Sequence, residues 1–188
     1  VQVHDFGLQD SVTFMAMEYI QGITLKERLI GLRASGHKMP IREAATIARE
    51  VAAALDHAHE HGLIHRDVKP ANILLRDGAD ENAPRQAILT DFGIAKMLEG
   101  VQLTATGMSM GTPDYMAPEQ VSGDPVGAQT DVYALGVVYF EMLTNVLPFS
   151  ADTPIAVLLK HMSDEPPSPR LLVPDLPATL DDVLHRAL

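Results

Sequence analysis

The chain has 188 residues, and 46% of them are hydrophobic, which is enough to form the core of one globular domain. Fourteen Lys and Arg against 25 Asp and Glu leave a formal net charge of -11, so a general interaction with the phosphate backbone of nucleic acid is not expected. Cysteine is absent, which excludes disulfides and thiolate metal sites and fits a reducing compartment such as the cytoplasm.

The apolar run from Tyr133 to Phe140 is too short to cross a bilayer, so we expect a soluble domain without a membrane segment. A longer protein containing this domain could still be membrane-anchored. The first residue is Val1, and an apolar helical pattern continues to Leu188 without a capping signal. We therefore expect the chain to continue at both ends.

The first predicted element is a buried strand from Thr13 to Ile20, because this segment is apolar and partly aromatic. A turn is expected after it at Gln21 and Gly22. Upstream, the run Asp5-Phe6-Gly7 predicts a turn between two strands, since Asp and Gly are common turn residues.

Two helices are predicted next. Thr24 and Glu27 have the spacing of a capping box, which predicts a helix that ends before Gly36 and Pro40. Over residues 41–61 the apolar positions recur every three or four residues, as in an amphipathic helix. The residues His57, His59 and His61 alternate along that helix and share no face, so we expect solvated histidines rather than a metal site.

The remaining predicted elements alternate between short strands, loops and helices. We expect β-like runs at 63–64, 73–75 and 87–89, a hairpin loop over 76–85, a mobile loop over 98–114, a wholly buried helix over 130–143 and a final helix over 180–188.

A polar motif, His65-Arg66-Asp67-Val68-Lys69-Pro70-Ala71-Asn72, follows an apolar pair and precedes a predicted strand. Asp67 can accept a hydroxyl proton, Lys69 can neutralise a phosphate, and the amide oxygen of Asn72 can ligate a hard cation. These are the groups that phosphoryl transfer requires.

Two further motifs follow in order. Asp91-Phe92-Gly93 comes directly after the predicted strand 87–89, and Gly111-Thr112-Pro113-Asp114-Tyr115-Met116-Ala117-Pro118-Glu119 follows the predicted mobile loop. With these motifs the chain resembles the protein kinase family, and it is most similar in pattern to bacterial eukaryotic-like (Hanks-type) serine/threonine kinases. The run Asp131-Val132-Tyr133-Ala134-Leu135-Gly136 resembles the central helix of that family, whose Asp holds the backbone of the catalytic loop.

The resemblance implies an α+β, protein-kinase-like fold that consists mostly of the helical C-terminal lobe. Residues 1–20 would be the end of the small lobe and the hinge strand, and residues 21–188 would be the larger lobe. The implied activity is transfer of the ATP γ-phosphate to Ser or Thr hydroxyls of protein substrates, with Mg²⁺, or alternatively Mn²⁺, as the metal. A kinase dimer for autophosphorylation is a further option.

The resemblance also assigns roles to residues. Asp67 would orient and deprotonate the substrate hydroxyl, Lys69 would contact the γ-phosphate, and Asn72 and Asp91 would ligate the metal. On the adenine side, Met17 would be the gatekeeper and Leu74 the floor of the pocket. The hinge residues would be Glu18, Tyr19 and Ile20.

Regulation is expected in the predicted loop. Thr104 and Thr106 are candidate phosphorylation sites, and Arg66 would hold the phosphorylated loop. Thr112 resembles the family Thr that contacts Asp67 and Lys69, so its phosphorylation should disrupt the site. The alternative is that Thr104 and Thr106 are solvated loop residues.

Several features of a complete kinase are absent from these 188 residues: a Gly-rich phosphate loop, a strand Lys and its helix Glu. The first lysine, Lys26, lies beyond the hinge, and the Arg that the family pairs with Glu119 is expected beyond Leu188. We therefore expect these residues alone to be inactive. The competing hypothesis is a non-catalytic kinase-like module that acts by binding, and retention of Asp67, Asn72 and Asp91 argues for the kinase.

Overall fold

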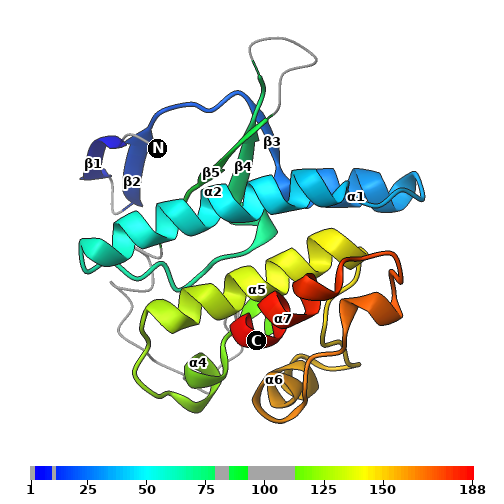
Figure 1. Ribbon diagram of the computed structural model, residues 1–188. Coiled ribbons are helices and arrows are strands. Elements are labelled where there is room, and N and C mark those ends of the chain that lie inside the picture. The colour runs from blue at the N-terminus through cyan, green and yellow to red at the C-terminus, as the bar shows by residue number, and fades with distance from the viewer. Residues whose placement is uncertain (1–2, 10–11, 79–84, 93–112) are drawn as a thin grey trace.

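The computed structural model describes residues 3–9, 12–78, 85–92 and 113–188. Within these residues, the strands all lie before residue 90, and helices predominate from residue 113 onward (Figure 1). The elements are β1 (Val3–Gln9), β2 (Val12–Met17), β3 (Gly22–Thr24), α1 (Leu25–Ala34), α2 (Ile41–Glu60), η1 (Pro70–Asn72), β4 (Ile73–Arg76), β5 (Gln86–Leu89), η2 (Pro113–Tyr115), α4 (Pro118–Ser122), α5 (Ala128–Thr144), α6 (Pro154–Ser163), η3 (Pro169–Leu171) and α7 (Ala178–Ala187).

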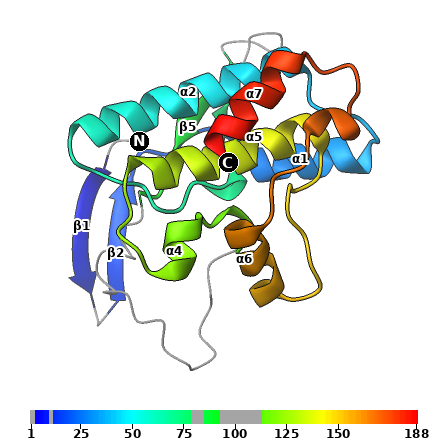
Figure 2. The same ribbon diagram turned by 60° about the horizontal axis from the view of Figure 1, so that its bottom comes forward.

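The strands form two separate antiparallel sheets. β1 pairs with β2, and β3, β4 and β5 form the second sheet in that order. The hairpin formed by β1 and β2 lies at one end of the molecule in both views (Figures 1 and 2). Formation of β4 and β5 as an antiparallel pair confirms the predicted hairpin around residues 76–85, although residues 79–84 lie outside the described part.

Two predictions for the N-terminal hairpin were wrong. Asp5, Phe6 and Gly7 lie within strand β1 rather than in a turn, since β1 continues to Gln9. The predicted buried strand is also shorter and more exposed than expected: β2 ends at Met17, whose side chain is 40% exposed. A two-stranded ribbon leaves one face uncovered unless another element packs against it, and alternation of strand side chains then exposes apolar residues.

Strand β3 was not predicted, and it starts where a turn was expected. Gly22 opens the strand with φ +152°, and a Cβ at this position would lie 2.1 Å from the carbonyl oxygen of Leu75 on β4. Only glycine allows the two backbones to approach this closely. The predicted β-run at 63–64 does not form a strand, and these residues lie in the connection from α2 to the polar motif 65–72.

The predicted helices are confirmed. Thr24 and Glu27 form the complete capping box of α1, in which the Thr24 hydroxyl accepts from the Glu27 N–H and the Glu27 carboxylate accepts from the Thr24 N–H. The amphipathic helix is α2, and the final helix is α7, which begins two residues earlier than predicted. The short helix α4 and the longer α6 were not predicted.

The buried helix α5 is the centre of the molecule. Most of its residues are buried, including Phe140 and Met142, because α2 packs on it from one side and α7 from another (Figure 1). The core extends from α5 to the buried faces of α1, α2, β4 and β5. The polar motif 65–72 connects α2 to β4, so it is held between the helical core and the second sheet.

Candidate active site

The polar motif 65–72 is a short loop whose backbone is fixed by a buried carboxylate. Asp131, in the first turn of α5, is fully buried, and its two oxygens accept hydrogen bonds from the backbone N–H groups of His65 and Arg66, each at 2.8 Å. This contact is the one that the sequence predicted for Asp131. Arg66 has φ +65°, an unusual conformation for a residue with a side chain, and the two bonds from Asp131 hold the backbone there.

A third partner of Asp131 was not anticipated. His59 Nε2 lies 2.7 Å from Asp131 Oδ2 and must donate, since a carboxylate only accepts. The side chain of His59 is only 16% exposed, so the prediction of a solvated histidine was wrong at this position. The alternating spacing did indicate that His59 faces differently from His57 and His61, but only the packing of α2 on α5 brings it to Asp131.

The side chain of His65 connects Thr90, which precedes Asp91, to Asp67. Its buried ring donates from Nε2 to the carbonyl of Thr90 at 2.9 Å and accepts the backbone N–H of Asp67 at Nδ1 at 3.2 Å. Accepting at Nδ1 requires the neutral ring with its hydrogen on Nε2. One side chain therefore links the residue before Asp91 to Asp67.

The structure brings together the three polar side chains of the motif. Lys69 Nζ donates to Asp67 Oδ2 at 2.7 Å, and Asn72 Nδ2 donates to the same oxygen at 3.0 Å and to the backbone carbonyl of Asp67 at 2.9 Å. The carboxylate is thus oriented by a cation and an amide. This arrangement can present a proton acceptor beside a positive charge, as transfer of a phosphoryl group to a hydroxyl requires.

Asp91 is placed next to this cluster through Thr90. The backbone N–H and the hydroxyl of Thr90 both donate to the carbonyl of Asn72, at 2.9 and 3.1 Å. Asp91 itself is exposed and has φ +57°, and the ring of Phe92 packs against His65 with the centroids 4.7 Å apart. Two residues of left-handed backbone, Arg66 and Asp91, therefore flank the cluster, and such strain is typical of functional sites.

These residues fit a nucleotide-bound divalent cation. The amide nitrogen of Asn72 faces Asp67, which leaves the amide oxygen on the opposite side, and the carboxylate of Asp91 is exposed. In the described part of the chain no group of three His, Cys, Asp or Glu side chains could hold a metal alone. A site with one carboxylate and one amide instead suits an ion that receives its other ligands from phosphates and water.

The residues predicted to contact adenine are less enclosed. Tyr19 is 89% exposed, whereas Ile20 is buried and Leu74 is half-buried on β4. Glu18 and Arg76 form an ion pair at 2.9 Å, which links this segment to β4. Leu74 therefore lies on the second sheet and Ile20 is buried just before it, while Met17 and Tyr19 remain at the surface.

One wall of the site is formed by η2 and α4. The Gln120 side chain accepts from the Ala117 N–H at 3.1 Å and donates to the carbonyl of Arg66 at 3.0 Å, so α4 is bound to the residue immediately before Asp67. Glu119 accepts the hydroxyl of Thr130 at 2.5 Å. Gln120 was not identified from the sequence as a site residue, since a Gln within a helix carries no distinguishing pattern.

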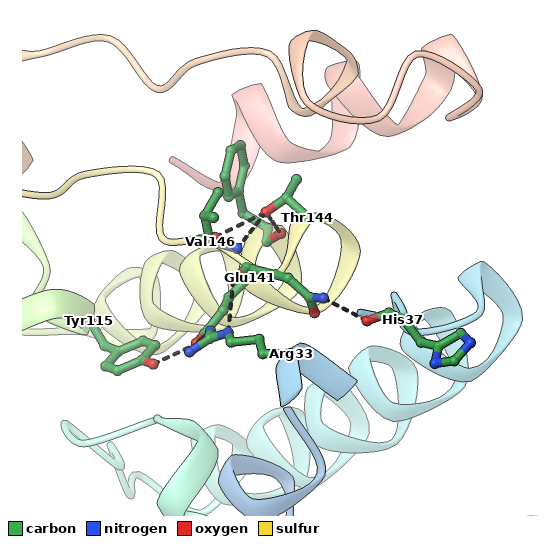
Figure 3. Close-up of polar contacts among 8 residues, drawn as sticks. Arg33, His37, Tyr115, Glu141, Thr144 and Val146 are labelled. Atoms are coloured by element: carbon green, nitrogen blue, oxygen red, sulfur yellow. Dashed lines mark hydrogen bonds and ion pairs between the residues drawn. The ribbon is translucent and has the colours of Figure 1, made fainter. Parts of the chain in front are cut away.

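A second polar network connects η2 to α5 and α1. The Tyr115 hydroxyl donates to Glu141 Oε2 at 2.6 Å, and Arg33 of α1 pairs with the other oxygen of the same buried carboxylate (Figure 3). Burial and the nearby carboxylate raise the pKa of Tyr115, so the phenol remains protonated and donates. Asn145 belongs to the same network, because its carbonyl accepts a hydrogen bond from Arg33 Nε at 2.8 Å and its amide donates to the carbonyl of His37 at 2.7 Å.

The predicted regulatory residues are only partly described. Arg66 is half-buried, and its Nε has no hydrogen-bond partner among the described residues. Thr104, Thr106 and Thr112 lie outside the described residues, as does Gly93. The predicted mobile loop also lies outside them, apart from its last two residues, which begin η2.

Comparison with known proteins supports the same interpretation. The protein kinase domain family matches residues 1–173. The serine/threonine-protein kinase PrkC of Bacillus subtilis is 35% identical over 187 residues, covering 100% of this chain and 27% of that protein. PknD of Mycobacterium tuberculosis is 40% identical over 189 residues, again covering 100% of this chain and 27% of that protein.

A solved structure agrees in fold. The crystal structure of the PknI kinase domain of Mycobacterium tuberculosis has a TM-score of 0.74 and 33% identity, and the match covers 99% of this chain and 62% of that chain. This chain spans about a quarter of the length of the curated relatives that it matches.

Proposed function

This chain belongs to the protein kinase family, and on that premise we propose that the protein containing it transfers the γ-phosphate of ATP to Ser and Thr hydroxyls of other proteins. The observation that carries this proposal is the cluster of Asp67, Lys69 and Asn72, with Asp91 attached to Asn72 through Thr90. The candidate proton acceptor, the cation and the two candidate metal ligands are present, and Asp67 is oriented by hydrogen bonds from Lys69 and Asn72.

In this proposal the Asp67 carboxylate receives the proton of the attacking hydroxyl. Lys69, whose Nζ lies 2.7 Å from Asp67 Oδ2, compensates the negative charge that develops on the transferred phosphoryl group. Asn72 donates to the same oxygen, so both side chains orient the carboxylate. Positioning of reacting groups of this kind accounts for a large part of enzymatic phosphoryl transfer.

The metal in this proposal is Mg²⁺, with Asn72 and Asp91 as its protein ligands. Family membership implies ATP and a divalent cation in general. Mg²⁺ fits the available donors, one carboxylate and one amide, because Mg²⁺ sites commonly combine few protein oxygens with phosphates and water, and Mn²⁺ accepts the same oxygen donors. The bound ion would neutralise charge on the β- and γ-phosphates.

A non-catalytic kinase-like module is the competing function. Such a module would not need an ordered proton acceptor, yet Asp67 is oriented by two side chains and Asp131 holds the loop at two backbone positions. This organisation favours catalysis. ATP binding without transfer in the full-length protein would favour the module instead.

The test compares two isosteric substitutions in the full-length protein. We expect Asp67→Asn to lower phosphoryl transfer by about a thousandfold or more and to leave the affinity for Mg-ATP within about twofold, because the nucleophile loses its proton acceptor while the nucleotide keeps its contacts. Asp91→Asn should instead weaken Mg-dependent ATP binding.

Asp152→Asn, an exposed position near α6, is the matched control and should change neither property. Transfer is measured with radiolabelled ATP at saturation, and binding is measured by titration with and without Mg²⁺. Equal loss of ATP affinity in the Asp67 and Asp91 variants would contradict the assignment of roles.

Further aspects of the proposal rest on the resemblance. Residues 1–20 would form the end of the small lobe with the hinge at Glu18 to Ile20, and the domain would act in the cytoplasm on protein substrates, without nucleic acid. In the described residues no helix is both long enough and apolar enough to span a membrane. Autophosphorylation at Thr104 and Thr106 within a dimer, recognised by Arg66, would regulate the site.

A further inference from the structure

The side chain of Gln120, on α4, contacts the backbone immediately before Asp67, and the chemistry proposed above does not use it. Gln120 is the third residue of the helix, and its backbone N–H donates to the carbonyl of Ala117 at 2.9 Å. Its partly buried side chain makes two hydrogen bonds: Oε1 accepts from the Ala117 N–H at 3.1 Å, and Nε2 donates to the carbonyl of Arg66 at 3.0 Å. One amide therefore joins the start of α4 to the polar motif 65–72.

The first of these contacts can be made by Glu or Gln, whereas the second requires Gln. At the third position of a helix, either residue can accept the free N–H of the residue that precedes the helix. A carboxylate would suit this contact well, because negative charge is favoured at a helix N-terminus. It could not, however, donate to the carbonyl of Arg66. The amide at position 120 is therefore explained by the polar motif rather than by the helix.

The carbonyl that Gln120 binds belongs to the peptide group between Arg66 and Asp67. A peptide group is planar and almost always trans, so its C=O and N–H point in opposite directions. Gln120 binds the C=O of this group, and His65 Nδ1 accepts its N–H at 3.2 Å. The group cannot turn about the line between its two Cα atoms without losing both hydrogen bonds. Its orientation in turn fixes the backbone of Asp67 and the direction in which the carboxylate leaves the chain.

Restraint is needed here because Arg66 has an unfavourable backbone conformation. Its φ is +65°, a value that residues with a Cβ rarely adopt. Asp131 accepts the N–H of Arg66 at 2.8 Å and so holds the peptide group before this residue, and Gln120 holds the peptide group after it. Two elements, α5 and α4, therefore hold the residue that precedes Asp67 from both sides.

We propose that Gln120 is a positioning residue that sets the direction of the Asp67 carboxylate by fixing the peptide group between Arg66 and Asp67. This inference rests on the proposed kinase function. Both side-chain hydrogen bonds of Gln120 are to backbone groups, at Ala117 and Arg66, and neither is to a candidate metal ligand. The inference therefore concerns the transfer step and not the binding of ATP.

The main test is Gln120→Glu in the full-length protein. Glutamate keeps the length of the side chain and the acceptor for the Ala117 N–H, but it replaces the donor with a second acceptor that faces the carbonyl of Arg66. We expect kcat to fall about tenfold, because the proton acceptor is presented less often in the reactive direction. The KM for ATP should stay within about twofold, since the nucleotide keeps its contacts.

A second variant and a control accompany it. Gln120→Met removes the donor without adding charge and should lower kcat to a similar extent, which would assign the effect to the lost donor. Gln129→Glu makes the same chemical change as the main test at an exposed position of α5, and it should leave kcat and KM unchanged. An unchanged kcat in either variant at position 120, or a loss of ATP affinity as large as the loss of kcat, would overturn the proposal.

A readout independent of catalysis separates this inference from the proposed function. The Asp67 N–H is the other polar end of the peptide group that Gln120 holds. We expect its amide hydrogen exchange to be about fivefold faster in Gln120→Glu and Gln120→Met than in the wild type or Gln129→Glu, because the group can turn once its C=O is released. Absence of phosphoryl transfer in the wild type would refute the kinase function alone, whereas unchanged exchange at Asp67 would refute the role of Gln120.

Discussion

The polar loop 65–72 and the N-terminal hairpin are held in place by different kinds of hydrogen bond. Backbone groups of the loop are bonded to buried side chains of distant elements, Asp131 on α5 above all. The hairpin, which lies at one end of the molecule (Figure 2), is hydrogen-bonded through its own two strands. Its residue Leu8 is 72% exposed. The polar motif 65–72 is therefore organised by the helical core, whereas Met17, predicted for the adenine side, lies on the less supported hairpin.

Among the changes proposed here, Asp131→Ala should have the largest effect, because it removes the carboxylate that holds the 65–72 loop. It leaves two buried backbone N–H groups and His59 without their acceptor, so we expect the protein to lose about 3 kcal/mol of stability and at least a hundredfold of phosphoryl transfer. Asp131→Asn retains one acceptor oxygen, so its stability and its phosphoryl transfer should lie between those of the wild type and of Asp131→Ala. Urea unfolding and radiolabelled transfer measure the two quantities. A loss below about 1 kcal/mol in Asp131→Ala would mean that the loop is held by other contacts.

The second prediction concerns acid stability of the helical part. Burial lowers the pKa of His161, on α6, from its usual value of 6.5 to about 4, so the unfolded chain binds the proton more readily. The contribution of this group is complete above about pH 6.5 and is lost as the pH falls toward 4, with a slope of up to about 1.4 kcal/mol per pH unit.

The groups that act on His161 are Tyr133, with Glu119 beside it, and Asp114. The difference in unfolding free energy between wild type and His161→Phe should therefore depend on pH between 4 and 6.5 and be constant above pH 7. Thermal unfolding across this range measures it. A difference that is independent of pH would show that His161 is not the group that titrates.

A smaller effect is expected from Tyr115→Phe. The change removes one hydrogen bond to the buried carboxylate of Glu141, which keeps Arg33, so the stability should fall by about 1 kcal/mol. The KM for a protein substrate should rise, because η2 is supported from this side as well. Tyr19→Phe, at an exposed tyrosine, is the control. Identical stability of the two variants would argue that the Tyr115 hydroxyl contributes nothing.

The smallest effect is expected in the hairpin. Leu8→Thr replaces an exposed apolar side chain with a β-branched polar one, so the change in stability should be within about 0.5 kcal/mol. Urea unfolding measures it beside Leu29→Ala, a buried position on α1, where a loss of about 2 to 5 kcal/mol is expected. A loss above 1 kcal/mol in Leu8→Thr would indicate that another surface covers the hairpin.

The sequence predicted those elements whose signal is local. The capping box at Thr24 and Glu27 and the apolar period of α2 specified their helices because neighbouring residues make the contacts involved. The motif residues Asp67, Lys69 and Asn72 were also found from local spacing, and the structure brings them within hydrogen-bond distance. Predictions failed where distant elements decide whether a residue is buried. Strand β2 has an exposed residue, Met17, where burial was predicted, and His59 is covered by α5 where exposure was predicted.

By itself, therefore, the sequence determined the family, the order of its motifs and the helices that build the core, since these depend on residue types at short separations. Only the tertiary structure decided which polar groups meet across the core: His59 and Asp131, Tyr115 and Glu141, or Tyr133 and His161. Each of these pairs joins two different elements and residues 26 to 72 positions apart. The physical reason is that a buried polar group must find a partner, and packing of whole helices rather than local spacing selects that partner.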